Sequence, residues 1–527
     1  MSNSLKQKSP ETEFPNRLVY FLALIFVALG VINSTPLIPG WDDLWRGITG
    51  IEKLKTRSFP TEWFYPIVFL LMMILVALKH SMWRAWKGTN KALFGMFMDI
   101  ALVISAAAIS LTYLIEIDSV CLIDMMSGER ARIMAETLKA EIEFAETMGL
   151  PKPDTVEDPK CVATTGVWLV AIMGSALIVF LGYNIKVWGF PLVAISLGIA
   201  AYTIATVMVW YFHGPDDINK YLMTKLGGEP RTFLDGVPNV HDALVNNASG
   251  FLGRFMHVIM NVVFPYIILG ALFGKSAGGQ TLIKLAFRWT RKLRGGPAHA
   301  AIVSSAMFGT ITGGPVVNVL STGVLTIPMM IKRGFSRVFA GGMEAAASSG
   351  GSIMPPVMGV AAFILAAMTA VPYKDVIIAA TLPALAYFIC LFLSASFQSR
   401  KQGIDAFGAL TDEMRISGKD VLHLCQIILP ILLILVLLLT PKDMVGCGFF
   451  ASLFGAETVL ENGRCTVISL PWGLQIFQNA AGDAGATGWW AAALVIVLLF
   501  IDKDFRSRPG KLLDALAESG LTIATLY

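Results

Sequence analysis

The chain has 527 residues, of which 55% are hydrophobic and only 15% are charged, and its mean hydropathy is +0.65. Soluble domains carry about 25% charged residues, so the composition excludes an ordinary soluble protein and predicts a membrane protein. The net charge is +4, and the basic residues lie in short loops instead of on one clustered face. We therefore expect no nucleic-acid partner.

Apolar runs of about 17–25 residues can cross the hydrocarbon core of a bilayer as helices. The N-terminal run lacks a small-residue cleavage site, which predicts a membrane helix and not a signal peptide. With an interrupted segment at about 337–370, which we expect to cross once, the runs predict an all-α polytopic protein with about ten transmembrane helices. The uninterrupted runs occupy residues 17–34, 61–79, 94–116, 163–184, 188–212, 251–274, 375–397, 420–440 and 485–501.

The basic residues follow the positive-inside rule when the N-terminus is cytoplasmic. Arg84, Lys87 and Lys91 then lie inside, whereas the acidic loop 117–162 lies outside. The basic loop 35–60 is an exception, and the helical spacing of its apolar residues from Trp41 to Leu54 predicts an amphipathic helix on the outer interface. The segment 300–326 has basic clusters on both sides, so we expect a re-entrant hairpin there instead of a full crossing.

Four of the six cysteines bracket the two longest loops that this topology places outside. An oxidising compartment permits disulfides there. Spacing alone does not fix connectivity, and unpaired thiols placed by chance are the alternative. The candidate bridges are Cys121–Cys161 and Cys447–Cys465.

The chain divides into a helical scaffold over residues 1–212, a polar connector over 213–250 and a block with broken helices over 251–527. Asp99 is an intramembrane carboxylate of the scaffold. Such a residue suggests function by default. A contact to a neighbouring helix or to headgroups is the preferred interpretation here, because no other sign of a site accompanies it.

Two breaks interrupt the apolar sequence of the third block. In the first, Gly313 and Gly314 permit unusual backbone angles, and Pro315 lacks the N–H that a helix needs. Freed carbonyl groups and side-chain oxygens suit an alkali cation, and helix N-termini can point N–H groups at an anionic solute. Close packing of small residues is the alternative. The candidate ligands are Thr312, Gly313, Gly314, Asn318, Ser321 and Thr322.

The second break follows Glu344, where five small residues and a double proline cannot continue a helix. Glu344 could bind a cation or a proton, or hold the two helix halves together. Two breaks in tandem are typical of a transporter site built from discontinuous helices. The candidate ligands are Glu344, Ser348, Ser349, Gly350, Gly351, Ser352, Pro355 and Pro356. Neither a P-loop, a zinc spacing nor a nucleophile group is visible, so we expect no enzyme and no catalytic residue.

The motifs NVLSTGVLTIPMMIKRG (318–334) and FAGGMEAAASSGGSIMPPVMGVAAF (339–363), followed by Tyr373, resemble the membrane component of a TRAP (tripartite ATP-independent periplasmic) transporter. The resemblance is greatest to the subgroup with fused small and large membrane subunits and a TAXI-type receptor. It implies an elevator-type protein of the bacterial inner membrane, with inverted repeats. Its function would be secondary uptake of an organic anion, driven by a sodium or proton gradient and fed by a periplasmic solute-binding protein.

The resemblance also assigns parts of the chain. Residues 1–212 would be small-subunit-like and 251–527 large-subunit-like. The hairpin tip would face the unwound helix, with no cofactor beyond a coupling ion, Na⁺. The candidate Na⁺ ligands are Gly313, Asn318, Ser348 and Gly350.

One departure concerns the second inverted repeat. After residues 503–511 a terminal helix begins, and no second hairpin or Pro-Pro break follows. We therefore expect a truncated chain or one product of a split gene, completed by a C-terminal fragment. A non-transporting half-transporter or membrane scaffold is the alternative function.

Overall fold

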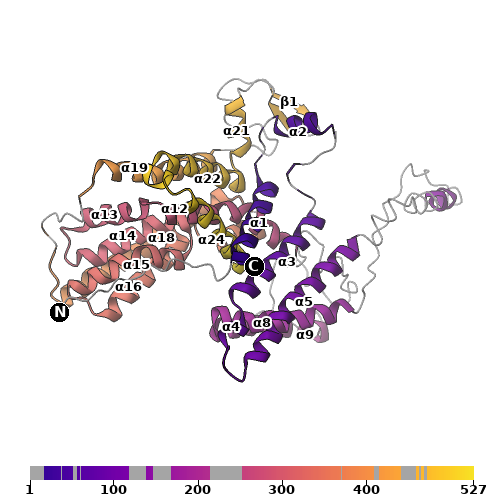
Figure 1. The fold of residues 1–527 in the computed structure, drawn as a ribbon, viewed down its shortest axis with the longest axis horizontal. Helices are drawn as coiled ribbons and strands as arrows, with labels where there is room; N and C mark the ends of the chain where they lie inside the picture. Colours follow the sequence, from indigo (N-terminus) through magenta and orange to yellow (C-terminus); the bar gives the residue numbers. More distant parts are fainter. Residues whose placement is uncertain are drawn as a thin grey trace. The chain divides into compact units, whose positions relative to one another are not determined.

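The computed structural model describes residues 17–36, 38, 40–50, 56–57, 59, 61–117, 138–145, 168–213, 252–369, 371–406, 408, 415–440, 458–461, 464–467 and 472–526. These residues are helical apart from turns and one short β-hairpin (Figure 1). The helices are α1 (Arg17–Ser34), α2 (Trp41–Thr49), α3 (Thr61–Lys79), α4 (Met82–Ala85), α5 (Ala92–Ile117), α8 (Trp168–Trp188), α9 (Phe190–His213), α11 (Arg254–His257), a π-helical stretch (Val258–Val263), α12 (Phe264–Lys275), α13 (Gly278–Thr290), α14 (Gly296–Thr312), α15 (Pro315–Lys332), α16 (Arg337–Gly350), a 3-10 turn (Gly351–Ile353), α17 (Val360–Thr369), α18 (Tyr373–Lys401), α19 (Gly418–Leu439), α21 (Trp472–Ala480), α22 (Ala484–Ile501), α23 (Lys503–Arg506) and α24 (Gly510–Leu526).

Nine helical segments of the described residues are long and apolar enough to cross a membrane. All but one of them coincide with predicted runs. The exception is Pro315–Lys332, which is the second limb of the predicted hairpin. The predicted run 188–212 forms α9, a helix of 24 mostly apolar residues over Phe190–His213. The helical membrane fold is thus confirmed, whereas the re-entrant course and the orientation remain predictions.

Contacts divide the chain into two compact units, one of residues 1–59 and 257–527 and the other of residues 60–256. The first unit includes α1 because this helix packs on α24, close to the C-terminus of the chain (Figure 1). A Cβ atom on Gly520 would lie 2.8 Å from Cγ2 of Val27, so the two helices touch closely at this glycine. The structural units therefore differ from the predicted functional division at 212 and 250, which remains a prediction.

The predicted hairpin is a pair of helices joined at two glycines. Helix α14 ends at Gly313, whose positive φ of 59° is a conformation that glycine adopts without steric cost. Helix α15 begins directly afterwards with Pro315, whose fixed φ suits the first helical position. The hairpin spans residues 296–332 and is longer at both ends than the predicted 300–326.

Two predicted features of the loops 35–60 and 441–470 lie partly outside the described residues. The predicted amphipathic helix is observed as α2 over Trp41–Thr49. The loop before α21 contains antiparallel strands β1 (Thr458–Glu461) and β2 (Arg464–Val467), which the sequence analysis did not predict. Cys465 pairs with Leu460 through this register, but its side chain is not described, and Cys121, Cys161 and Cys447 lie outside the described residues. Both disulfides remain predictions.

In the second unit, Asp99 of α5 joins α5 to α4 and α8. Its carboxylate accepts hydrogen bonds from the Ser81 hydroxyl at 2.5 Å, from the Met82 N–H at 2.8 Å and from the Trp83 N–H at 3.2 Å. The Tyr183 hydroxyl donates a further bond from α8. A carboxylate at the N-terminus of a helix satisfies orphan N–H groups, so Asp99 makes the interhelical contact that the preferred interpretation predicted.

Replacing Asp99 should therefore destabilise the second unit. Asp99→Ala leaves two backbone N–H groups and two hydroxyls without their acceptor, which we expect to cost about 2–4 kcal/mol and to lower the apparent melting temperature of the purified protein. Asp405→Asn, at an exposed carboxylate, is the control and should melt like the parent. An unchanged melting temperature for Asp99→Ala would contradict this role.

Candidate functional site

The hairpin and the broken helix form one layer of the first unit. Helix α14 packs against α15, α16 and α18, and α15 packs against α16. Figure 1 shows α14, α15, α16 and α18 side by side. This packing brings the two predicted breaks together, because the tip of the hairpin and the end of α16 meet at α14.

The two breaks approach each other backbone to backbone. A Cβ atom on Gly309 would lie 2.3 Å from Cα of Gly351, and one on Gly313 would lie 1.8 Å from the carbonyl oxygen of Met358. Neither contact leaves room for a side chain. Glycines in α14 and at its end thus allow the hairpin tip to lie directly on the interrupted helix.

The interrupted helix follows the predicted break. Helix α16 ends at Gly350, a 3-10 turn covers Gly351–Ile353, and α17 starts only at Val360. The peptide bond between Pro355 and Pro356 is cis. Within the non-helical stretch, the Gly359 N–H bonds the Ser352 carbonyl at 2.6 Å, and the Tyr373 hydroxyl donates to the Pro356 and Val357 carbonyls. These hydrogen bonds therefore provide partners for some of the backbone N–H and carbonyl groups that the break leaves without helical partners.

Asn318 is the polar link across the hairpin. Its side chain is fully buried, and its Nδ2 donates to the Ser305 carbonyl at 2.9 Å. The same Nδ2 would lie 2.8 Å from a Cβ atom on Gly351. An amide therefore stands where the two limbs of the hairpin and the 3-10 turn converge.

Glu344 lies at the centre of a second polar cluster, which we call the carboxylate cluster. Its side chain is 0% exposed. Oε1 accepts from Ser305 at 3.1 Å, from Ser348 at 3.3 Å and from Thr322, and Oε2 accepts from Thr326 at 2.6 Å. In the described ranges, no Lys, Arg or His lies at ion-pair distance from Glu344. The cluster joins α14, α15 and α16 through hydroxyl groups alone.

Two hydroxyls of the cluster, those of Thr322 and Thr326, also have acceptors in their own helix. The Thr322 Oγ1 lies 2.8 Å from the Asn318 carbonyl oxygen, and the Thr326 Oγ1 lies 3.0 Å from the Thr322 carbonyl oxygen. Because a hydroxyl carries one hydrogen, each threonine can direct it either to Glu344 or to the backbone. The cluster can therefore redistribute its hydrogen bonds without moving its heavy atoms. The bonds of Glu344 link α14, α15 and α16. The roles predicted for Glu344, binding a cation or a proton or holding the two halves of the broken helix together, remain predictions.

Other predicted ligands point back to their own turn. The hydroxyls of Thr312, Ser321, Ser349 and Ser352 donate to the carbonyls of Phe308, Val317, Ala345 and Ser349, respectively. The predicted Na⁺ ligands are also divided between two places. Gly313 faces Met358 and Gly359 at the hairpin tip, whereas Ser348 bonds Glu344. Among the described residues, no group of three or more His, Cys, Asp or Glu side chains could hold a metal ion.

The sequence analysis missed Ser305 and Thr326. Thr326 follows Thr322 by four residues, so the helical repeat places both on one face of α15, and this spacing was a usable signal. Ser305 lies on the other limb, 39 residues before Glu344. Its role depends on how the hairpin folds back, which no local pattern reveals.

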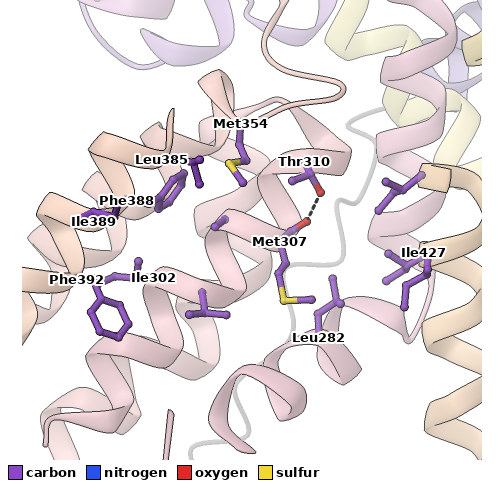
Figure 2. Close-up of a pocket in the computed structure, with 14 residues that line it drawn as sticks. Leu282, Ile302, Met307, Thr310, Met354, Leu385, Phe388, Ile389, Phe392 and Ile427 are labelled. Carbon is purple, nitrogen blue, oxygen red and sulfur yellow. Dashed lines mark hydrogen bonds between the residues drawn. The ribbon is translucent and has the colours of Figure 1, made fainter. Parts of the chain in front are cut away.

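A cavity beside the hairpin has a different chemistry. It has a volume of about 360 Å³ and lies between α14 and α18 on one side and α13 and α19 on the other (Figure 2). Its wall is apolar except for Thr310, whose hydroxyl donates to the Met307 carbonyl at 2.7 Å. The labelled residues in Figure 2 include Leu282, Ile302, Met354, Phe388 and Ile427. An ionic solute would find no partner there, so this cavity is not the solute site.

The comparison with known families connects this geometry to a class of proteins. A family described as "Tripartite ATP-independent periplasmic transporter, DctM component" matches residues 169–526, which is more than half of the chain. The chain belongs to this family. It is therefore a TRAP permease component, a membrane transport protein and not an enzyme. The match includes the hairpin, the interrupted helix, Asn318 and the carboxylate cluster, as the resemblance of the sequence motifs predicted.

Several curated proteins are similar over shorter stretches. The C4-dicarboxylate TRAP transporter large permease protein DctM of Vibrio cholerae is 26% identical over 159 residues, covering 30% of this chain and 35% of that protein. DctM of Pseudomonas aeruginosa is 23% identical over 229 residues, covering 39% and 52%. The isethionate TRAP transporter permease protein DctMQ of Oleidesulfovibrio alaskensis is 35% identical over 98 residues, covering 19% and 15%. The chain spans about half or less of the length of these relatives.

The close contact between the breaks predicts a sharp effect of one methyl group. Gly309→Ala would push α14 away from Gly351, so we expect destabilisation by about 1–3 kcal/mol and a lower apparent melting temperature. Gly342→Ala is the matched control, because Gly342 also lies inside a helix but has nothing within 4 Å of its Cβ position. The control should be neutral or stabilising by up to about 1 kcal/mol. Equal melting temperatures for the two variants would contradict the close packing of Gly309 against Gly351.

The carboxylate cluster predicts a comparable effect of one hydroxyl. Thr326→Val keeps the shape of the side chain but removes the bond to Glu344, which we expect to cost about 1–3 kcal/mol. Thr381→Val in α18 is the control, since it removes only a bond to the Ile377 carbonyl of its own helix. Thermal unfolding in detergent should separate the two variants. The cluster would have no role in stability if both lost the same amount.

Proposed function

We propose that this chain forms the hairpin and broken-helix part of a secondary transporter that takes up an organic anion across the bacterial inner membrane. The observation that carries the proposal is the direct contact of the hairpin tip at Gly313 with the interrupted helix at Met358. Non-helical backbone at membrane depth is tolerated where protein buries it or where it lines a cavity, and transporters use it as a binding site. Membership of the TRAP permease family supports the same conclusion.

The proposed solute class follows from the available groups. The N-terminus of α15, which runs over Pro315–Lys332, offers N–H groups and a positive dipole end to an anion. The related permeases from Vibrio cholerae and Pseudomonas aeruginosa are named for C4-dicarboxylates and that from Oleidesulfovibrio alaskensis for isethionate. These solutes are all organic anions, which supports an anion here.

We further propose that a sodium gradient drives uptake, with a proton gradient as the other candidate. Carbonyl and amide oxygens at Gly313, Asn318, Ser348 and Gly350 are hard ligands of the kind that an alkali cation prefers. The solute would arrive on a periplasmic binding protein of the TAXI type. In this proposal, the N-terminus is cytoplasmic and residues 1–212 act as the small-subunit-like scaffold fused to the elevator-type transport part.

Reconstitution in liposomes tests this function. We expect uptake of a radiolabelled dicarboxylate only when the binding protein and an inward Na⁺ gradient are both present. Asn318→Ala should weaken the apparent Na⁺ affinity about tenfold, because the ion would lose one of the oxygen atoms that bind it. Asn184→Ala is the control, because Asn184 lies on α8 and bonds only the Phe180 carbonyl of its own helix.

The assay should be run on the chain alone and with the product of any reading frame directly downstream co-expressed. Uptake that follows a proton gradient and ignores Na⁺ would reject sodium coupling while keeping the transporter. A folded protein that shows neither uptake nor Na⁺-dependent solute binding in either form would support the membrane-scaffold alternative.

A further inference from the structure

A second cavity lies in the other unit, between α3, α4 and α5. Its volume is about 610 Å³. Its wall is apolar over one part and carries a basic side chain at one end. Ile74 and Leu78 of α3 and Ile100 and Ile104 of α5 line the apolar part, whereas Trp83 and Arg84 of α4 line one end. We call this cavity the α3–α5 groove.

The apolar part of the groove lies between two candidate membrane spans, Phe64–Ala85 and Ala92–Leu114. The Ile100 and Ile104 side chains are 50% and 61% exposed in the protein, so the groove opens to the side. At membrane depth, an opening of this kind faces hydrocarbon and not water. The occupant of the apolar part is therefore expected to be a hydrocarbon chain.

The end at α4 is cationic. Arg84, Lys87 and Lys91 are exposed and lie within eight residues of one another on α4 and the following turn. Lys87 Nζ lies over the Trp83 ring, 5.4 Å from its centroid. Tryptophan with lysine or arginine at the end of a span is typical of the headgroup level of a bilayer.

Among the described residues that line the groove, Asp99 is the one acidic side chain. Its oxygens accept bonds from Ser81, from the Met82 and Trp83 N–H groups and from Tyr183. The carboxylate is thus directed into the start of α4 and not toward an incoming ligand. The charge offered at this end comes from the basic side chains.

We propose that the α3–α5 groove holds one anionic phospholipid, with its phosphate at Arg84 and an acyl chain against Ile74, Ile100 and Ile104. The elongated apolar wall with a single cationic end matches the amphipathic shape of such a lipid. Basic clusters beside membrane spans attract anionic headgroups. A packed helix from another chain would not need the cationic end at this depth. The proposal does not depend on transport, so its test is independent of the uptake assay.

Native mass spectrometry of the full chain in detergent tests the headgroup. Phosphatidylglycerol and phosphatidylcholine with identical acyl chains are titrated separately. We expect the protein to retain phosphatidylglycerol at about fivefold lower concentration, the effect of about one basic side chain at a headgroup. Arg84→Gln should abolish this preference. Arg506→Gln, at an exposed arginine of α23, should keep it.

A second pair of variants tests the chain-binding wall. Ile104→Trp should fill the groove and lower the retention of both lipids. Ile178→Trp, at a 72% exposed position of α8 outside the groove, should not. Arg84→Lys keeps the charge and should keep the preference for phosphatidylglycerol, which guards against misfolding of Arg84→Gln.

Four results would overturn the proposal. The first is equal retention of the two lipids by the parent protein. The second is an equal loss of preference in Arg84→Gln and Arg506→Gln. The third is unchanged retention in Ile104→Trp. Inorganic phosphate is added as a separate probe, and stabilisation by phosphate as strong as by phosphatidylglycerol would show an anion site without a lipid.

Discussion

The hairpin and the interrupted helix depend on contact between backbones. A helix that stops within a membrane leaves N–H and carbonyl groups that lipid cannot satisfy. Gly309 and Gly351 let α14 and the 3-10 turn approach so closely that no side chain fits between them. The Asn318 amide then reaches the Ser305 carbonyl, and Tyr373 reaches the carbonyls after the double proline. Without the glycines, neither set of polar contacts would have its geometry.

A buried carboxylate with only hydroxyl partners complements this packing. Burial of an unpaired charge is costly unless hydrogen bonds surround it. Glu344 meets this condition through side chains from three helices, so the carboxylate requires all three to be in place. The glycine contacts allow α14, α15 and α16 to approach, and the cluster around Glu344 fixes how they are aligned. The two motifs that carry the family resemblance contain Thr326, Glu344 and Ser348, whereas Ser305 and Gly309 precede both motifs in the sequence.

Local chemistry made the breaks predictable from the sequence. Gly313, Gly314 and Pro315 end one helix and begin another, and the run from Ser348 to Pro356 stops a helix, whatever surrounds them. The apolar runs similarly predicted the spans by length. Ser305 as a partner of Glu344 and the packing of α1 on α24 could not be predicted, because each depends on segments that are distant in sequence. The β1–β2 hairpin was missed because its four-residue strands carry little alternating pattern.

Hydrogen bonds link seven helices of the first unit into two groups. Polar side chains link α14, α15, α16 and α18, as in the carboxylate cluster and the bond between His299 and Ser396. Others link α13, α19 and α22, through Lys284 with Asp420 and Gln426 with the Leu498 carbonyl. In the described residues, no hydrogen bond joins α14 to α19, and the apolar cavity of Figure 2 lies between these helices. Polar contacts between the two groups include the Thr290 bond at the α13–α14 turn and the bonds of Arg291, at the end of α13, to Gly408 after α18. Displacement of the first group along the α14–α19 boundary would otherwise exchange mainly apolar contacts. The proposed elevator motion requires such a boundary, and the chemistry of α14 provides it by carrying Ser305 and Gly309 on one face and Val303, Met307 and Thr310 on the other.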